Sequence, residues 1–276
     1  MARFAAADFK KDLPASLILS SENNLYYRLQ NAFTTAEIKA CDTSVPILHS
    51  DIYYPSTGLF IARDTQLYLA VKAGDNADSH NHNDTGSFTI YKSGKPLLID
   101  IGVESYTKKT FSAQRYDIWT MQSAYHNLPT VNGFMQKDGA EYRAKDVIYR
   151  MGKDVCDIEM DISDAYPAEC GLLFYKRHAS LYKDKNIIIE DSFSVPPSQV
   201  VISLMTYEKP VVYSVSFEGG VSISIGTLGN LQIEGGTVYK TEEIPVTDPR
   251  LMVVWKHEIY RILVIPSKKS LKMLIS

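Results

Sequence analysis

The residues best suited to chemistry are three histidines and one aspartate that fall between residues 79 and 133. His80 and His82 are two positions apart, Asp100 ends a short apolar run, and His126 lies among small polar residues. Two neutral imidazoles and one carboxylate form a ligand set that suits zinc, with a fourth position left for water or a neighbouring group. Histidines are also common on exposed strands, so the spacing alone leaves a plain surface role open.

A hairpin in the same stretch is expected to bring the carboxylate back toward the histidines. Residues 88–91 are rich in aromatic and β-branched side chains, residues 93–95 have a turn composition, and residues 96–99 provide a return strand that ends at Asp100. Side chains two positions apart on an extended strand share a face. The segment that holds both histidines is therefore predicted to be a strand, or a loop that enters one.

These residues resemble the heparinase II/III-like domain, the all-β portion of polysaccharide lyases that cleave heparan-type glycosaminoglycans, alginate oligomers and related uronic-acid polymers. The resemblance is carried by HNHNDTGSF at residues 80–88, GKPLLIDIG at 94–102, RY at 115–116 and YHNLPTVNG at 125–133. In complete members this domain follows a large α/α toroid, and the cleft between the two parts is the active site. No segment of this sequence resembles the toroid.

The resemblance also implies roles for individual residues. It assigns a structural zinc ion to three ligands, His82, Asp100 and His126. His80 would lie on the substrate side, where it would neutralise a uronate or exchange a proton. Tyr116 would act as acid or base, with a packed loop aromatic as the competing interpretation. Arg115 and Asn83 would bind the substrate, and Asn83 together with Asp84 could instead orient the imidazoles.

Composition and charge narrow the function classes. The chain has 276 residues, of which 45% are apolar, so it can bury a large core. A net charge of -3 gives no reason to expect nucleic acid or an anionic membrane as partner. Recognition of an acidic polysaccharide or oligosaccharide would therefore depend on local groups. The three cysteines lack CxxC spacing, which excludes a cysteine zinc site but leaves one disulfide pair open.

The N-terminal segment lacks the strand patterns of the rest of the chain. Residues 1–11 lack the apolar core of a signal peptide, and no apolar run is long enough to span a bilayer. The parent protein is nevertheless expected to be periplasmic or extracellular. Residues 1–50 are predicted to be a linker or a remnant that packs on an absent domain, with a short capped helix near residues 25–33 as an equal alternative.

Residues 51–276 are predicted to form one all-β domain, a large antiparallel two-layer β-sandwich with little helix outside the N-terminal segment and the loops. A hairpin is expected from residues 59–63 and 66–72. Further strand signals recur at short intervals with glycine turns between them, at residues 156–162, 172–182, 187–195, 200–207, 221–225, 231–234 and 261–265.

A long loop over the site is predicted for residues 106–116, which lack strand alternation but contain several aromatic residues. Aromatic side chains in such a loop stack on sugar rings or fix the loop to the domain. The second role is the prediction for Phe111 and Trp119.

The function that follows is that of the β-sandwich part of a polysaccharide lyase, inert until a toroid domain on the same or a separate chain is supplied. A carbohydrate-binding or structural β-sandwich is the non-enzymatic alternative. A cupin-like metal enzyme is a further alternative, because Gly74, His80 and His82 match the opening of the cupin metal motif. The glutamate expected next in that motif is replaced by Ser87 and Phe88.

Overall fold

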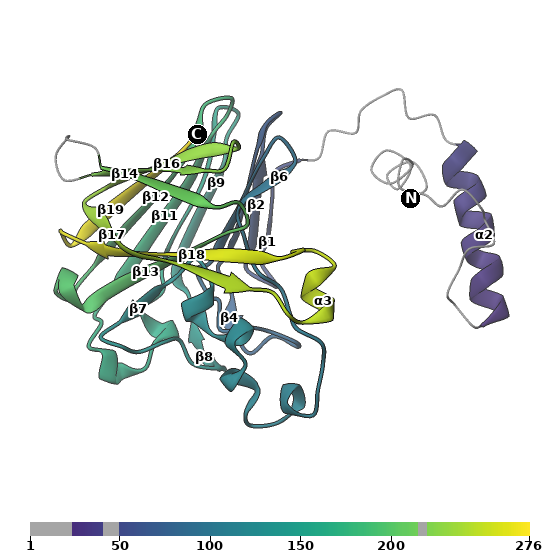
Figure 1. Ribbon diagram of the computed structural model, residues 1–276, viewed down its shortest axis with the longest axis horizontal. Coiled ribbons are helices and arrows are strands. Elements are labelled where there is room, and N and C mark those ends of the chain that lie inside the picture. Colours follow the sequence, from purple (N-terminus) through teal and green to yellow (C-terminus); the bar gives the residue numbers. More distant parts are fainter. Residues whose placement is uncertain (1–23, 41–49, 215–219) are drawn as a thin grey trace. The chain divides into compact units, whose positions relative to one another are not determined.

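The computed structural model describes residues 24–40, 50–214 and 220–276. The chain divides into two compact units, Met1–Ser50 and Asp51–Ser276. In the first unit, α2 (Leu25–Ala40) begins after Asn24, whose Oδ1 accepts a hydrogen bond from the backbone N–H of Tyr26 at 2.9 Å. The predicted helix is therefore present and extends to Ala40 (Figure 1), and the packing of this segment on a further domain stays a prediction. His49 and Cys41 lie outside the described residues.

The second unit is built from antiparallel sheets, as predicted. One sheet has five strands in the order β1 (Ile52–Tyr54), β2 (Leu59–Arg63), β3 (Leu67–Lys72), β5 (Phe88–Lys92) and β6 (Lys95–Leu98). Another has eight, in the order β14 (Pro210–Ser214), β15 (Val221–Ile225), β16 (Gly229–Glu234), β19 (Ser270–Ile275), β12 (Asn186–Phe193), β11 (Tyr175–Tyr182), β10 (Val155–Asp161) and β9 (Lys145–Met151).

Two smaller sheets complete this unit. A four-stranded sheet has the order β17 (Gly236–Pro245), β18 (Glu258–Pro266), β13 (Val200–Thr206) and β7 (Pro129–Val131). A two-stranded sheet pairs β4 (Asp75–Asn76) with β8 (Gly139–Arg143). The remaining helices are short and lie in loops, among them α3 (Pro249–Met252).

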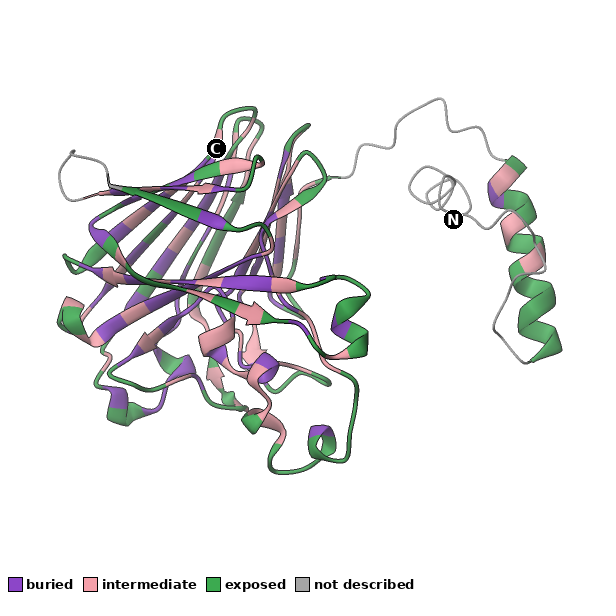
Figure 2. Ribbon diagram, in the orientation of Figure 1, coloured by how far each residue is buried: buried purple, intermediate pink, exposed green. Residues whose placement is uncertain are grey.

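The main core lies between the five-stranded and eight-stranded sheets, which stand face to face in Figure 1. Leu67, Leu69 and Val71 of β3 alternate with half-buried residues, so one face of this strand is apolar. They join one cluster with residues of β10, β11 and β12, the nearest strands of the opposite sheet. Figure 2 shows such buried positions along the strands of both layers. The two-layer β-sandwich prediction is confirmed.

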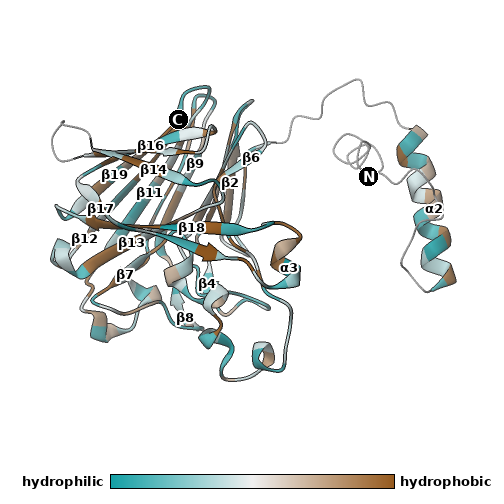
Figure 3. Ribbon diagram, in the orientation of Figure 1, coloured by the Kyte–Doolittle hydropathy of each residue, from teal (hydrophilic) through white to brown (hydrophobic). Residues whose placement is uncertain are grey.

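A second apolar cluster fixes the exit from β6. Ile99 and Ile101, on either side of Asp100, are buried together with Met205 and Trp255. The backbone N–H of Ile99 donates to the Met205 carbonyl at 2.9 Å, and Trp255 Nε1 donates to the Ile101 carbonyl at 2.8 Å. Figure 3 shows the hydrophobic residues along β13 and β18 that border this region. Because the side chains of Ile99 and Ile101 are buried in this cluster, the Asp100 side chain between them is fixed in position and points to the opposite side of the chain.

Both predicted hairpins are present, since β2 pairs with β3 and β5 pairs with β6. Cys156 and Cys170 are buried free thiols, so no disulfide joins these two. Among the described residues, no helix is long and apolar enough to cross a membrane.

Candidate metal centre

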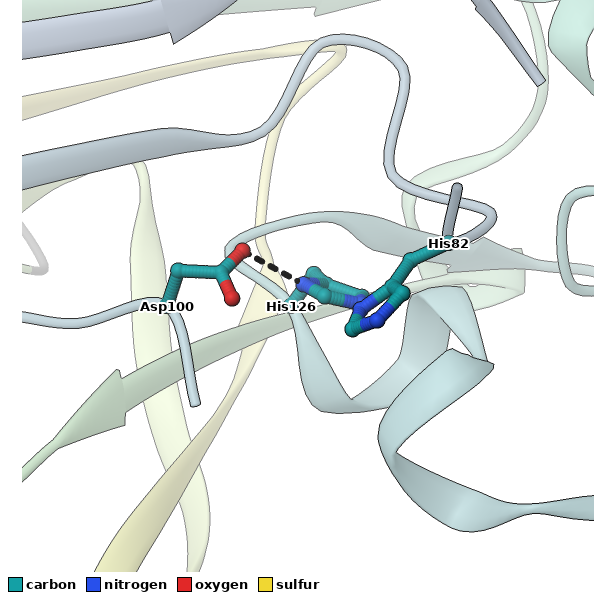
Figure 4. Close-up of side chains that lie close together, drawn as sticks. All are labelled: His82, Asp100 and His126. Atoms are coloured by element: carbon teal, nitrogen blue, oxygen red, sulfur yellow. Dashed lines mark hydrogen bonds and ion pairs between the residues drawn. The ribbon is translucent and has the colours of Figure 1, made fainter. Parts of the chain in front are cut away.

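Three side chains from separate loops converge at one end of the sandwich. His82 precedes β5, Asp100 follows β6, and His126 follows the 3₁₀ helix Ser123–Tyr125. One ligand atom from each of the three lies within 4.8 Å of the others, and Figure 4 shows the side chains turned toward one another. His126 Nδ1 is 3.0 Å from Asp100 Oδ2, and the centroids of the two imidazole rings are 5.3 Å apart.

The dimensions and donor set fit a zinc ion. Tetrahedral zinc with bonds of about 2.0 Å places its ligand atoms about 3.3 Å apart, so the widest of these separations must shrink by at most about 1.5 Å. His126 is fully buried, and its Nε2 has no hydrogen-bond partner among the described residues. Buried polar atoms are almost always paired. An unpaired imidazole nitrogen beside a second imidazole and a carboxylate therefore points to a bound cation.

The electrostatics of His82 and Asp100 favour the protonation states that metal binding needs, whereas Asp100 favours a protonated His126 that would have to lose its proton to bind an ion. Burial, followed by the charge of His126, lowers the pKa of His82 to about 4, so this imidazole is neutral near pH 7. Burial raises the pKa of the Asp100 carboxyl, but His126 outweighs that effect and holds the pKa well below its usual range. Burial likewise lowers the pKa of His126, and the Asp100 carboxylate outweighs it and raises the pKa.

Asp100 can serve the centre in two ways. Its Oδ1 accepts a hydrogen bond from the backbone N–H of Gly102 at 3.0 Å, and its Oδ2 faces His126. Either the carboxylate ligates the ion directly, or it fixes the tautomer and orientation of the His126 ring, as carboxylates behind metal-bound histidines do.

Buried amides hold the loop that carries the histidines. Asn76 Oδ1 accepts from the backbone N–H and the hydroxyl of Thr85, at 3.3 and 2.9 Å. Asn76 Nδ2 donates to Gln136 Oε1 at 3.1 Å, and Gln136 Nε2 donates to the Thr85 carbonyl at 2.7 Å. All three side chains are buried, so this end of the loop is fixed from beneath.

Asn127 fixes the position of its neighbour His126. Its buried Nδ2 donates to the carbonyls of Phe88 and Ile99, at 2.6 and 3.1 Å, and its Oδ1 accepts from the backbone N–H of Met205 at 2.7 Å. Asn127 therefore ties the His126 loop to both strands of the hairpin that ends at Asp100. Sequence analysis found neither this residue nor Asn76 and Gln136, because single buried amides leave no periodic signal.

His80 does not share a face with His82. The segment between β4 and β5 is a loop that enters a strand, and His80 has a φ of +61°. This left-handed conformation breaks the alternation of an extended chain. The exposed His80 ring stacks on Tyr106 instead, with ring centroids 5.8 Å apart and planes 7° apart. The cupin alternative, which needs both histidines on one ion, loses its basis.

Arg115 and Tyr116 both donate hydrogen bonds to Asn81, the residue between the two histidines. Arg115 Nη2 donates to the Asn81 carbonyl at 2.8 Å, and the Tyr116 hydroxyl donates to Asn81 Oδ1 at 2.9 Å. Arg115 Nη1 also donates to the Thr110 carbonyl at 2.9 Å. Burial, followed by the charge of Asp138, raises the pKa of Tyr116, so its hydroxyl is protonated near neutral pH. Both residues thus lie beside the histidine loop and hold its conformation.

Asn83 and Asp84 lie apart from the open side of the site. Asn83 is 4% exposed and its Nδ2 donates to the Gln136 carbonyl at 3.2 Å, a placement that favours a role in holding the loop over contact with substrate. Asp84 pairs with Lys72 at 2.5 Å and makes no hydrogen bond to His82 or His126, although its charge raises the pKa of both imidazoles.

The loop over the site is present between Asp100 and His126, and it contains four short 3₁₀ helices from Lys109 onward. Trp119 fixes it as predicted, because its ring packs on the second apolar cluster and its Nε1 donates to Glu104 Oε1 at 2.7 Å. The prediction for Phe111 is wrong, since this side chain is 67% exposed.

Comparison with known proteins agrees with this architecture. The chain matches the family described as Heparinase II/III-like, C-terminal, over residues 47–244. It is therefore a β-domain of the heparinase II/III-like class, and the chain belongs to that family. A comparison with curated proteins finds no match.

Solved structures of lyases share the fold. The heparan sulfate lyase HepC from Pedobacter heparinus aligns with a TM-score of 0.64 and 14% identity, over 100% of this chain and 42% of that one. A structure titled Heparinase III-BT4657 gene product aligns with a TM-score of 0.59 and 14% identity, over 91% of this chain and 40% of that one. Another, titled Heparinase III, gives 0.60 and 13%, over 92% and 42%. This chain thus spans about two fifths of these proteins.

Proposed function

We propose that this chain is the β-sandwich part of a polysaccharide lyase that cleaves a uronic-acid-containing polysaccharide, of the heparan sulfate or alginate type, by β-elimination. The observation that carries the proposal is the convergence of His82, Asp100 and His126 in a member of the heparinase II/III-like family, with His80 on the open side. The fold is shared with heparan sulfate lyases, which supports an acidic polysaccharide as substrate.

β-Elimination requires three tasks, and residues of this chain suit two of them. The charge of the uronate carboxylate must be neutralised, a base must take the C5 proton, and an acid must protonate the departing O4. His80 is exposed and suits the first task or a proton exchange. Tyr116 carries its proton near neutral pH and suits the acid. To act as base it would first have to release that proton, which now lies in a hydrogen bond to Asn81.

A zinc ion held by His82, Asp100 and His126 would crosslink the loops and would not take part in the reaction itself. The three residues come from the histidine loop, the end of the hairpin and the loop of 3₁₀ helices. Joining them would fix the backbone that carries His80. This assignment rests on the donor set and on the unpaired Nε2 of His126.

The remaining catalytic groups would come from a toroid domain, on the same or a separate chain, so the isolated chain is expected to be inactive. The relatives of known structure are more than twice as long, which supports a further domain. Residues 1–50 would pack against it, since α2 leaves Leu25, Leu29 and Phe33 half or more exposed. The parent protein would be periplasmic or extracellular, where such polysaccharides occur.

Metal analysis of the purified chain tests the centre. We expect close to one zinc per chain, with loss in His82→Ala and Asp100→Ala and retention in the control His178→Ala. His178 is a half-exposed histidine on β11 whose ring pairs with Asp157 and Glu190 on the sheet surface. Iron or manganese in place of zinc, or full zinc in His82→Ala, would overturn the zinc assignment.

Glycan assays test the substrate and the role of His80. Heparan sulfate and alginate oligosaccharides should bind to the chain, and His80→Ala should weaken that binding. Ultraviolet absorbance of unsaturated uronates should not appear with the chain alone. Turnover by the isolated chain would refute the need for a toroid, and unchanged binding by His80→Ala would favour a carbohydrate-binding or structural β-sandwich.

A further inference from the structure

Three aromatic rings form an exposed patch beside the metal centre. Tyr106 is 42% exposed and Phe111 is 67% exposed, and both belong to the loop over the site. Their ring centroids are 5.5 Å apart in an edge-to-face arrangement, and the exposed His80 ring lies 5.8 Å from Tyr106 and 6.4 Å from Phe111. Rings that cluster on the surface rather than in the core offer an apolar face to a ligand.

A cation lies directly over this patch. The Arg250 guanidinium carbon is 4.8 Å from the centroid of the Tyr106 ring. Arg250 belongs to α3, whose N-cap Asp248 accepts a hydrogen bond from the backbone N–H of Ser105 at 3.0 Å. This contact joins two segments far apart in sequence, so Arg250 is brought to Tyr106 by the fold. In the described part of the chain, its guanidinium has no carboxylate partner.

The loop beneath the patch is held in place before any ligand binds. Thr110 is 2% exposed, its Oγ1 accepts from the backbone N–H of Thr107 at 3.0 Å, and its carbonyl accepts from Arg115. Tyr106 and Phe111 flank this anchored turn. A rigid arrangement lowers the entropy lost on binding.

The charge around the patch selects an anionic ligand. Lys108 and Lys109 lie on the same loop and are exposed, and Lys109 has only a 4.0 Å contact with Asp117. A neighbouring cleft of about 620 Å³ is lined by four carboxylates and one ammonium group, so its excess of negative charge repels a polyanion. The carboxylates belong to Glu104, Glu242, Glu243 and Asp248, and the ammonium group belongs to Lys240. A polyanion that passes His80 is therefore directed over the aromatic patch and not into the cleft.

We propose that Tyr106, Phe111 and Arg250 form a binding subsite for one anionic sugar residue of the polysaccharide, next to the residue that meets His80. The apolar C–H face of the sugar ring stacks on the exposed Phe111 ring and meets Tyr106 beside it, and Arg250 pairs with the carboxylate or sulfate group of the sugar. The inference rests on the proposed function, because it places this subsite beside the same reaction centre.

Calorimetric titration of the 276-residue chain with a heparan sulfate hexasaccharide and an alginate hexasaccharide tests the subsite. Tyr106→Ala and Phe111→Ala should each weaken binding by about 5- to 20-fold. Arg250→Gln should weaken it by about 5- to 10-fold and reduce its dependence on salt. Two controls should stay within about twofold of wild type. They are Tyr239→Ala, 67% exposed on β17, and Arg150→Gln, 65% exposed on β9.

The outcomes separate the subsite from the proposed function. If His80→Ala weakens binding and the three subsite variants, shown to be folded by their thermal midpoints, bind within twofold of wild type, the subsite is refuted and the proposed function stands. If the wild-type chain binds neither oligosaccharide, both are refuted. If the control variants lost as much affinity as the subsite variants, the subsite would also be refuted, because any exposed aromatic or arginine side chain would then contribute equally to binding.

Discussion

Replacement of Arg177 by methionine tests how the two loops of the metal centre are fixed to the sandwich. Arg177 is fully buried on β11 and pairs with Asp191 through Nε–Oδ1 at 2.8 Å and Nη2–Oδ2 at 2.6 Å. Its Nη1 donates to the carbonyls of Gly86 and Asn127, at 2.8 and 2.7 Å. Gly86 lies in the histidine loop and Asn127 follows His126, so one guanidinium holds both loops.

The cost of this replacement follows from the groups that lose their partners. The Asp191 carboxylate is 2% exposed and would keep only the hydrogen bond from Tyr175. Removing one partner of a buried ion pair costs about 3–5 kcal/mol, and each carbonyl left without a donor adds about 1 kcal/mol or more. Methionine fills most of the volume and leaves little cavity, so we expect a loss of about 5–7 kcal/mol, or about 10–25 °C in the thermal midpoint of a domain of this size.

Urea unfolding of Arg177→Met measures this loss directly. Arg150→Met is the matched control, since Arg150 is 65% exposed and pairs with Asp157 on the surface, where such a pair contributes about 1 kcal/mol or less. The double variant Arg177→Met/Asp191→Leu should be more stable than the single variant, because no buried charge is left unpaired. A loss below about 1 kcal/mol in Arg177→Met, or no recovery in the double variant, would refute this account.

Three further predictions concern the same loops. Removal of the metal by a chelator should lower the thermal midpoint of the wild-type chain by about 5–10 °C, because a metal present at 100 times its Kd stabilises the folded state by about 2.7 kcal/mol. The thermal midpoint of His82→Ala should not respond to the chelator. In the metal-free protein, the pKa of His82 is about 4 in the folded state and 6.5 in the unfolded chain. Between these two pH values the unfolded chain therefore binds a proton at His82 and the folded chain does not. Stability in urea should therefore rise by about 1–3 kcal/mol across this range, and His82→Ala should lack most of the rise. Gly86→Ala should lower the free energy of unfolding by about 1–3 kcal/mol, because Gly86 has a φ of +87° and an added Cβ would lie 2.7 Å from Ile162 Cγ2. The control Gly94→Ala, where an added Cβ meets nothing within 4 Å, should lower it by about 1 kcal/mol. Chemical denaturation measures both values.

The parts of the fold that sequence predicted are those whose signals are local. The hairpins β2–β3 and β5–β6 have alternating or β-branched strands joined by short turns, and both formed as predicted. The edge strands β9 and β14 and the long β17 were not predicted. Their residues are mostly exposed or half-buried, so no apolar face marks them. Strands of this kind depend on pairing with a neighbour rather than on their own pattern.

The candidate site shows a similar division. The sequence indicated which residue types could form a metal centre, and the hairpin explained how Asp100 returns toward the histidines. The positive φ of His80 could not be predicted, since histidine adopts it only when the surrounding structure requires it. Asn76, Gln136 and Arg177 come from segments far from the histidines in sequence, so only the folded chain reveals that they support the site.

The loops of the centre are therefore held from two sides by different means. On the sandwich side, Arg177 and Asn127 join both loops to the buried strands through hydrogen bonds that need no ion. On the open side, Arg115 and Tyr116 hold Asn81 of the histidine loop, and His126 contacts Asp100. The His82 ring lies close to both His126 and Asp100 but makes no hydrogen bond to either of them. A metal ion would close that gap. Its removal should consequently loosen the backbone near His80 while the sandwich keeps its core, which is the behaviour expected of an ion that orders a site rather than a fold.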